Sequence, residues 1–247
     1  YYDTDERRYN MEKVFLTTKD GIKIVADYRN VDVSKYQQPL GWLVLVHMMP
    51  AIKESWRDLA ENLRNSGYES IAIDLRGHGE STARINADLT QNNTEVLNYQ
   101  NFSDDEHQKS ILDLETAVDY LVKEKQAARD KIIFIGASIG ANLSLQYIAE
   151  HSEFRTAILL SPGLNYRGIK TEPMVKNLKS GQRVFFVSAK DDIRSSGNNN
   201  AEENQKLYEL TTEGVEKKIQ IYETGGHGTD ILENQPELKE LIINFIK

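Results

Sequence analysis

The chain of 247 residues contains no cysteine. Disulfide bonds, thiolate catalysis and cysteine-ligated zinc are therefore excluded from its chemistry. It also lacks any apolar run near the roughly 18 residues that a membrane-spanning helix needs. The absence of cysteine fits a cytoplasmic protein and an exported one equally well. Because the chain opens with Tyr1 and not with methionine, we expect either a truncation or a removed signal peptide, so the compartment stays open.

No long block of charge of one sign is present either. The 30 Lys and Arg residues face 38 Asp and Glu residues, which gives a net charge of −8. Such a surface repels phosphate backbones and acidic membrane surfaces on average, so we expect no nucleic-acid partner. Hydrophobic residues make up 39% of the chain, which is enough for a sizeable core.

Strand and helix patterns alternate along most of the chain. Residues 1–12 are polar and are expected to form a lead-in, and residues 13–247 are expected to form a single domain. The alternation predicts βαβ units, and hence an α/β fold with about eight mostly parallel strands and helices on both faces. Expected strands are 14–18, 22–28, 42–46, 70–74, 132–135, 157–160, 184–188 and 218–222, and expected helices are 55–66, 110–123, 141–150, 202–211 and 237–246.

A serine stands where one of these strands must turn sharply into a helix. The apolar run 131–135 is followed by Gly136-Ala137-Ser138-Ile139-Gly140, which is the G-x-S-x-G pattern of a nucleophile elbow. Glycines at both ends let the backbone pass close to its neighbours, so the turn presents Ser138 at the carboxyl end of the strand. The pattern alone is weak. It becomes specific because an acid and a histidine follow, each just after another expected strand.

One of the five histidines is placed to serve as a base. Serine needs a base within hydrogen-bond reach, and a third group that holds the base in place. His227 lies in the glycine-rich turn 224–228 after the last expected strand, which favours a catalytic role over that of a surface histidine. The other four lie in loop motifs, in a polar insertion or at a helix end: His47, His78, His107 and His151.

Two neighbouring acids follow the expected strand 184–188. Asp191 and Asp192 are both candidates for the group that orients His227, and either could be an ordinary loop carboxylate. The order serine, acid, histidine along the chain is that of α/β-hydrolases and not that of chymotrypsin or subtilisin.

Main-chain donors are also needed to stabilise the oxyanion of a tetrahedral intermediate. The N–H of Ile139 follows the nucleophile at the amino end of a helix, where the helix dipole helps. A second donor is expected in the loop after the strand 42–46, at Met49 or next at Met48. The side chains of Met48 and Met49 could line an apolar acyl pocket or could fill the core.

Two polar stretches, 84–105 and 194–205, leave the carboxyl ends of expected strands. They are either binding loops or solvated surface loops.

From about residue 14 to residue 247 the chain resembles the α/β-hydrolase superfamily. The motifs are Asp20-Gly21-Ile22, Leu45-Val46-His47, the Asp-x-Arg-Gly-His-Gly-x-Ser stretch at 74–81, the elbow, the acid loop and the Gly-Gly-His turn. The resemblance makes His78 part of a structural turn, and the spacing after Ala189 selects Asp192 as the acid. It implies a lidless esterase similar to bacterial carboxylesterases and dienelactone-hydrolase-like proteins, because only residues 161–183 are available for a lid. Residues 84–105 are expected to cover part of the site instead. The family usually has His-Gly where this chain has His47-Met48.

We therefore expect a serine hydrolase that cleaves small carboxylic esters through an acyl-enzyme, with Ser138, His227 and Asp192 as its triad and with no cofactor or metal. An amidase or peptidase and a perhydrolase would use the same three residues. A non-catalytic binding protein on a hydrolase fold is the alternative of a different class. Nucleotide binding is disfavoured because the G-x-G-x-x-G and P-loop spacings are absent. The partner is expected to be a small-molecule ester, and the oligomeric state stays open.

Overall fold

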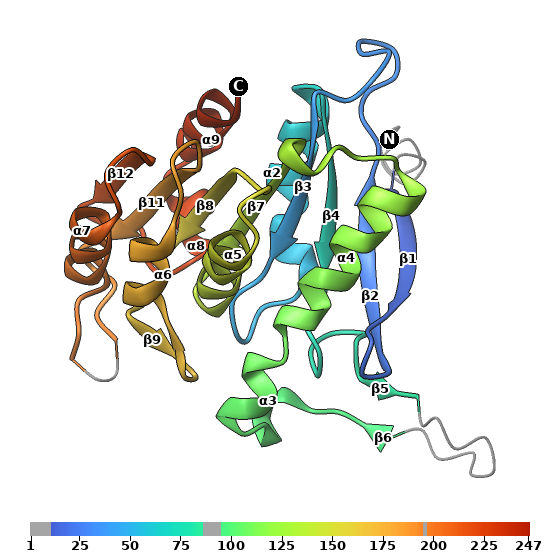
Figure 1. Cartoon of the computed structure of the whole chain (residues 1–247), viewed down its shortest axis with the longest axis horizontal. Helices are drawn as coiled ribbons and strands as arrows, with labels where there is room; N and C mark the ends of the chain where they lie inside the picture. The colour runs from blue at the N-terminus through green and yellow to red at the C-terminus, as the bar shows by residue number, and fades with distance from the viewer. Residues whose placement is uncertain (1–10, 86–94, 195–196) are drawn as a thin grey trace, which may run out of the picture.

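The computed structural model in Figure 1 is built on one large sheet. It describes residues 11–85, 95–194 and 197–247. In these residues the sheet has ten strands in the order β12-β11-β8-β7-β3-β4-β2-β5-β6, with β1 paired to β2. Eight strands have five or more residues: β1 (Met11–Thr17), β2 (Ile22–Arg29), β3 (Gly41–Val46), β4 (Tyr68–Ile73), β7 (Ile132–Ala137), β8 (Thr156–Leu160), β11 (Arg183–Ala189) and β12 (Glu216–Tyr222). β5 (Ala83–Arg84) and β6 (Glu95–Val96) have two residues each.

The six strands from β12 to β4 run parallel to one another. β2 pairs antiparallel with β4, and β1 pairs antiparallel with β2. The prediction of about eight mostly parallel strands is therefore confirmed. The expected lead-in was 1–12, but its last two residues, Met11 and Glu12, belong to β1. Residues 1–10 lie outside the described residues. Strands β3, β4, β7 and β8 are buried along their whole length, as is typical of parallel strands covered on both faces.

Helices cover both faces, and each face has its own core. Side chains alternate along β3, so that Val44 faces one core while Leu43 and Leu45 face the other. On one face lie α4 (Ile111–Glu124), α5 (Ile139–Glu150), α6 (Thr171–Asn177) and α7 (Asn200–Leu210), and on the other α2 (Arg57–Asn65), α8 (Asp230–Asn234) and α9 (Leu238–Ile246). The remaining described helical segments are η1 (Lys53–Trp56), η2 (Tyr99–Asn101), α3 (Asp104–Gln108) and η3 (Arg129–Lys131).

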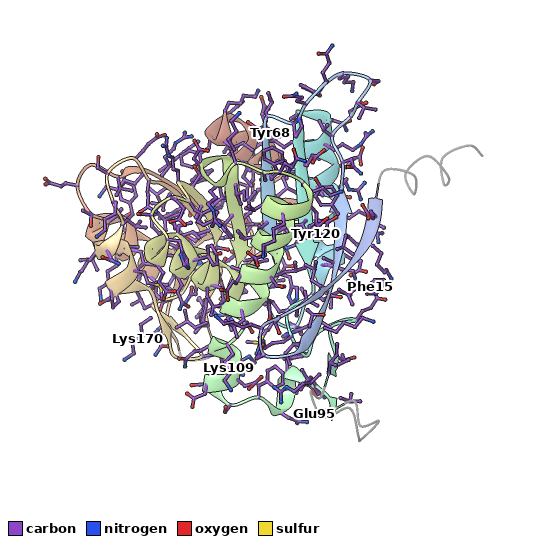
Figure 2. The ribbon with its side chains drawn as sticks, turned by 45° about the vertical axis from the view of Figure 1, so that its right-hand side comes forward. Phe15, Tyr68, Glu95, Lys109, Tyr120 and Lys170 are labelled. Atoms are coloured by element: carbon purple, nitrogen blue, oxygen red, sulfur yellow. The ribbon has the colours of Figure 1, made fainter. Side chains whose placement is uncertain are left out.

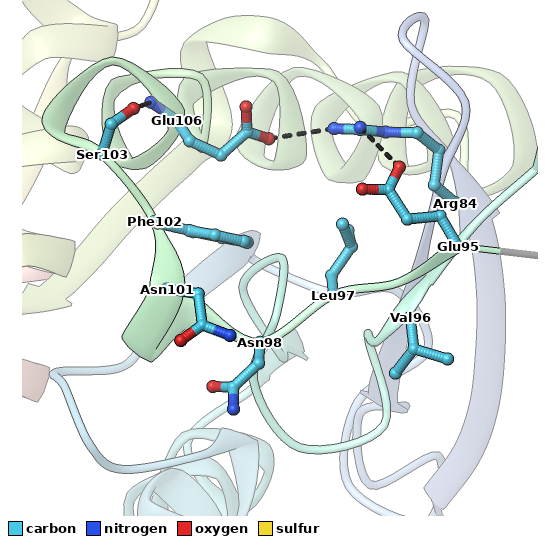
Figure 3. Close-up of a pocket in the computed structure, with 9 residues that line it drawn as sticks. All are labelled: Arg84, Glu95, Val96, Leu97, Asn98, Asn101, Phe102, Ser103 and Glu106. Atoms are coloured by element: carbon cyan, nitrogen blue, oxygen red, sulfur yellow. Dashed lines mark hydrogen bonds and ion pairs between the residues drawn. The ribbon is translucent and has the colours of Figure 1, made fainter.

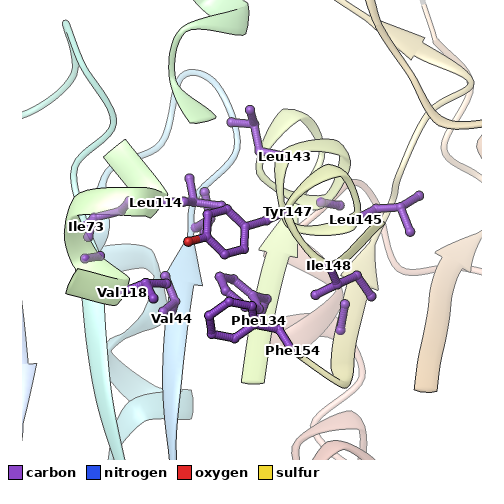
Figure 4. Close-up of a cluster of buried hydrophobic side chains, with 14 of the residues drawn as sticks. Val44, Ile73, Leu114, Val118, Phe134, Leu143, Leu145, Tyr147, Ile148 and Phe154 are labelled. Atoms are coloured by element: carbon purple, nitrogen blue, oxygen red, sulfur yellow. The ribbon is translucent and has the colours of Figure 1, made fainter. Parts of the chain in front are cut away.

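Aromatic contacts tie the sheet to α5. Figure 4 shows Phe134 of β7 beneath Tyr147 of α5, with Phe154 beside them. Their ring centres are 4.9 Å (Phe134–Tyr147) and 5.7 Å (Phe134–Phe154) apart. Close-packed aromatic pairs of this kind contribute about 0.5–1.5 kcal/mol beyond their buried area. The helix that follows Ser138 is thus held firmly on the sheet.

The carboxyl ends of the parallel strands meet at the lower end of the molecule in Figure 1. Two short structures lie at this end: α3 with the segment before it, and the hairpin of β9 (Asn165–Tyr166) and β10 (Ile169–Lys170). They touch, because Gln108 Nε2 donates a hydrogen bond of 3.1 Å to the carbonyl of Arg167. In Figure 2 Lys109, Lys170 and Glu95 lie at this end, while Tyr68 at the start of β4 lies at the other.

No separate lid domain is present in the described residues. Residues 161–183 form only the β9–β10 hairpin and α6, so the expectation of a lidless fold is confirmed. Of the polar stretch 84–105, residues 86–94 lie outside the described residues. The remainder of that stretch includes Arg84 of β5, all of β6 and η2, and the start of α3. The prediction of a loop did not include these short elements.

Candidate active site

Ser138 lies between the end of β7 and the start of α5 in a strained conformation. Its φ angle is 55°, in the left-handed region that residues other than glycine rarely adopt. Its N–H donates to the carbonyl of Leu160 on β8 at 2.8 Å, and its carbonyl accepts from the N–H groups of Ala141 and Asn142. Strand and helix both hold the turn, which is the elbow predicted from the sequence.

The two glycines of the elbow allow this close packing. A Cβ atom on Gly136 would collide with the main chain of Gly140. A Cβ atom on Gly140 would collide with the main chain of Val46 and His47 at the end of β3. The first turn of α5 therefore rests directly on β7 and on the loop after β3.

His227 and Asp192 form a close pair at the same edge of the sheet. His227 Nδ1 lies 2.6 Å from Asp192 Oδ2, and the Asp192 side chain is 3% exposed. Because a carboxylate only accepts, Nδ1 carries the proton, and Nε2 is left as the nitrogen that can take one. Nε2 is buried and has no hydrogen-bond partner among the described residues. This is the orientation that a general base beside a serine requires.

Asp191, the other sequence candidate, has different contacts. Its Oδ1 accepts hydrogen bonds from the N–H groups of Gly225 and Gly226 at 3.0 and 3.1 Å. Asp191 thus ties the glycine turn to the end of β11, and Asp192 contacts the imidazole itself.

Arg194 is a site residue that the sequence analysis did not identify. Its Nη1 lies 3.2 Å from Oδ1 of Asp192, the oxygen that His227 does not use. Burial acts to raise the pKa of Asp192, but the hydrogen bond with His227 and the ion pair with Arg194 outweigh it, so this pKa lies below its ordinary value. The carboxylate therefore stays charged.

Ser138 and His227 lie at the same edge without a hydrogen bond between them. The hydroxyl of Tyr166, on β9, lies near the Ser138 side chain. The Tyr166 ring also stands edge-on to the His227 ring, with 6.4 Å between the ring centres. Hydrogen bonds between catalytic groups are often long before substrate binds, so this arrangement is compatible with a triad. The sequence analysis did not identify Tyr166 as a site residue either.

The expected oxyanion donors come from the start of α5 and from the loop after β3. Ile139 is the first residue of α5, so its N–H has no acceptor within the helix. Met48 packs against one core and Met49 against the other. The sulfur of Met48 also lies against Gly228, next to His227, because a Cβ atom there would collide with it. Both methionines thus contribute to packing, and their contact with substrate stays a prediction.

His47 and His78 hold loops beside the site. His47 is fully buried; its Nε2 accepts from the N–H of Leu75 at 2.9 Å, and its Nδ1 bonds the carbonyl of Met48 at 2.8 Å. His78 stacks on Tyr99 with 3.8 Å between ring centres. Burial lowers the pKa of both imidazoles, so they stay neutral. These contacts agree with the structural role expected for His78.

The pocket in Figure 3 is separate from these residues. It has a volume of about 410 Å³ and is lined by residues of β5, β6, η2 and α3. Arg84 in its wall is paired with Glu95 at 2.8 Å and with Glu106 at 3.1 Å. In the part of the chain that the structure covers, no group of three or more acidic or histidine side chains is arranged to hold a metal ion. No described helix is long and apolar enough to cross a membrane.

The fold of this chain is similar to that of several solved structures. An esterase of Pyrococcus furiosus superposes with a TM-score of 0.74 at 18% identity, covering 100% of this chain and 95% of that one. An esterase from Exiguobacterium antarcticum gives a TM-score of 0.68 at 13% identity, over 95% of this chain and 99% of that one.

Sequence comparison gives one further relative and a family. A non-heme chloroperoxidase of Kitasatospora aureofaciens is 27% identical over 147 residues, which is 59% of this chain and 42% of that protein. The model of the alpha/beta hydrolase fold family matches residues 41–204, from β3 into α7. The chain therefore belongs to the alpha/beta hydrolase fold family.

Proposed function

We propose that this protein hydrolyses small carboxylic esters, with Ser138 as nucleophile, His227 as general base and Asp192 as the acid that orients it. The 2.6 Å contact between His227 Nδ1 and Asp192 Oδ2, at the edge to which the strained elbow brings Ser138, carries the proposal. The names of the superposed esterases agree with it.

Each proposed step uses a group at this edge. Ser138 Oγ gives up its proton to His227 Nε2 and attacks the ester carbonyl. The resulting oxyanion is stabilised by the N–H groups of Ile139 and Met49. His227 then returns the proton to the departing alcohol, which leaves Ser138 acylated. Water, deprotonated by His227, attacks the acyl-enzyme and releases the acid.

The test compares two serine-to-alanine variants on ethyl acetate. Ser138→Ala should abolish turnover, because no nucleophile is left. Ser188→Ala is the matched control, since Ser188 is a fully buried serine on β11 whose hydroxyl has no partner among the described residues. It should keep the wild-type rate. Full turnover in Ser138→Ala would contradict the proposal.

Perhydrolysis is the second candidate, and the chloroperoxidase relative favours it. In this reaction hydrogen peroxide takes the place of water, attacks the acyl-enzyme and releases a peracid. Incubation with acetate and peroxide should then yield peracetic acid with wild-type protein and none with Ser138→Ala. An equal, low yield with both proteins would leave hydrolysis as the activity.

A further inference from the structure

Three buried amides hold the loop that connects β8 to β10. Asn142 on α5 donates to the carbonyls of Gly163 and Ile169 at 3.1 and 3.0 Å, and accepts from the N–H of Gly163 at 3.1 Å. Asn200 and Asn204 on α7 donate to the carbonyl of Pro162 at 2.9 and 3.0 Å. All three asparagine side chains are fully buried.

Asparagine side chains are unusual at fully buried positions. Burial of an amide is unfavourable unless it is hydrogen-bonded, whereas a leucine would fill the same space without that requirement. Here the amides bond to the main chain of Pro162, Gly163 and Ile169. Their effect is to fix this loop on α5 and α7 in one conformation.

The fixed loop carries Tyr166, and its ring is supported on several sides. A Cβ atom on Gly163 would collide with the ring, so the ring lies directly against the loop backbone. Asn200 Nδ2 lies 3.4 Å from the hydroxyl. The guanidinium of Arg194 lies 5.9 Å from the ring centre. Tyr166 is therefore a rigid element and not a mobile surface side chain.

Tyr166 borders the space where the alcohol of an ester must lie. During hydrolysis the leaving oxygen lies between Ser138 Oγ, to which the acyl group is transferred, and His227 Nε2, which supplies the proton. Tyr166 lies beside both residues: its ring stands edge-on to His227, with 6.4 Å between the ring centres, and its hydroxyl lies near the Ser138 side chain. The expected oxyanion donors belong to α5 and to the loop after β3, so the carbonyl oxygen points elsewhere.

We propose that Tyr166 determines specificity for the alcohol portion of the substrate, as a fixed wall that admits small alcohols and excludes bulky ones. The proposal rests on ester hydrolysis at Ser138. It identifies the substrates as esters of small alcohols.

Two ester series and two variants test it. One series keeps the acyl group and changes the alcohol, from ethyl acetate to cyclohexyl acetate. The other keeps ethanol and changes the acyl group, from acetate to hexanoate. In Tyr166→Ala the ratio of kcat/KM for cyclohexyl over ethyl acetate should rise about tenfold or more, because lost steric exclusion is worth at least that much. The acyl ratio should change less than about twofold.

Tyr166→Phe is the matched control, because it keeps the ring and loses only the hydroxyl. It should keep the wild-type alcohol ratio. Tyr166→Leu provides a second, smaller side chain if Tyr166→Ala fails to fold. An unchanged alcohol ratio in both smaller variants, or a change confined to the acyl series, would overturn the role of Tyr166. Wild-type protein without Ser138-dependent hydrolysis would overturn the proposed function and this role together.

Discussion

Two adjacent carboxylates at the site, Asp191 and Asp192, have different contacts and should therefore have different effects on activity. Asp192 bonds the imidazole of His227, whereas Asp191 bonds the main chain of the turn that carries it. The first contact fixes the tautomer of the base, and the second fixes the position of its backbone.

Replacement of each acid by its amide should therefore have unequal effects. Asp192→Asn should lower kcat by about 10³-fold or more, because an amide does not hold the imidazole in the required tautomer or stabilise its charge. Asp191→Asn keeps an acceptor oxygen for the glycine N–H groups and should lower kcat by about tenfold or less. Steady-state kinetics on ethyl acetate measures both. Equal losses would show that the two acids are interchangeable, against this assignment.

Individual site residues could be predicted from the sequence only where they belong to a motif. Ser138, His227 and Asp192 follow strand ends in a recognisable order, and the structure brings the acid and the histidine into contact. Their catalytic roles stay predictions. Tyr166 and Arg194 belong to no motif, and only the folded loops bring them to the site. The buried asparagines beneath Tyr166 were equally invisible, because an asparagine in a helix reads as a surface residue.

At the scale of elements, the elbow depends on close backbone contact between α5 and the end of β3. Gly140→Ala should lower the free energy of unfolding by about 2–3 kcal/mol, because the new methyl group meets main-chain atoms that cannot move independently. It should also slow ester hydrolysis, because the displaced turn carries Ser138. Denaturant unfolding and initial rates measure the two effects.

Gly181→Ala is the comparison for this prediction. Gly181 has a φ of +88° and nothing within 4 Å of an added Cβ, so its substitution should cost about 1 kcal/mol from backbone conformation alone. The hydrolytic rate should stay at the wild-type level. If Gly140→Ala kept both wild-type stability and rate, the close packing of the elbow would be irrelevant to the site.

Long elements could be predicted from the sequence and short ones could not. Strands such as β3 and helices such as α4 have enough residues for a hydrophobic pattern to emerge. β5, β6, β9 and β10 have two residues each, and α3 and α8 have five, which is too short for any periodicity. They form because neighbouring segments offer them hydrogen bonds and contacts. At the site, β7, α5, β11 and β12 are long elements, whereas β9, β10 and α8 belong to this second group.

At the scale of the whole molecule, the alternation of strands and helices was sufficient to predict the sheet and its two helical layers. Parallel strands need crossovers, so the order of elements restricts the topology strongly. The placement of β2 and β1 beyond β4 does not follow from alternation. The position of this first hairpin depends on which edge strand of the parallel sheet it pairs with.

Buried histidines should make the stability of the molecule depend on pH. Burial lowers the pKa of His78 to about 3, whereas an unfolded histidine titrates near 6.5. Between these values the unfolded chain binds a proton that the folded chain does not, so stability is fully present above pH 6.5 and is lost as pH falls. From pH 7.5 to pH 5 this single group should remove about 2 kcal/mol.

Comparison of wild type with His78→Phe by urea unfolding at the two pH values isolates this loss. The wild type should lose about 2 kcal/mol more than the variant over this range. The difference cancels the other titrating groups, among them Asp113, whose burial raises its pKa to about 6. Equal losses in the two proteins would show that His78 is protonated in the folded state.

The central claim is that Ser138 is a nucleophile activated by His227, and covalent labelling tests it most directly. After incubation with a fluorophosphonate, peptide mass spectrometry should find one phosphonate adduct on Ser138 in the wild type. His227→Ala should be labelled much more slowly and Ser138→Ala not at all. An unlabelled wild-type protein, or an adduct on another residue, would contradict the account.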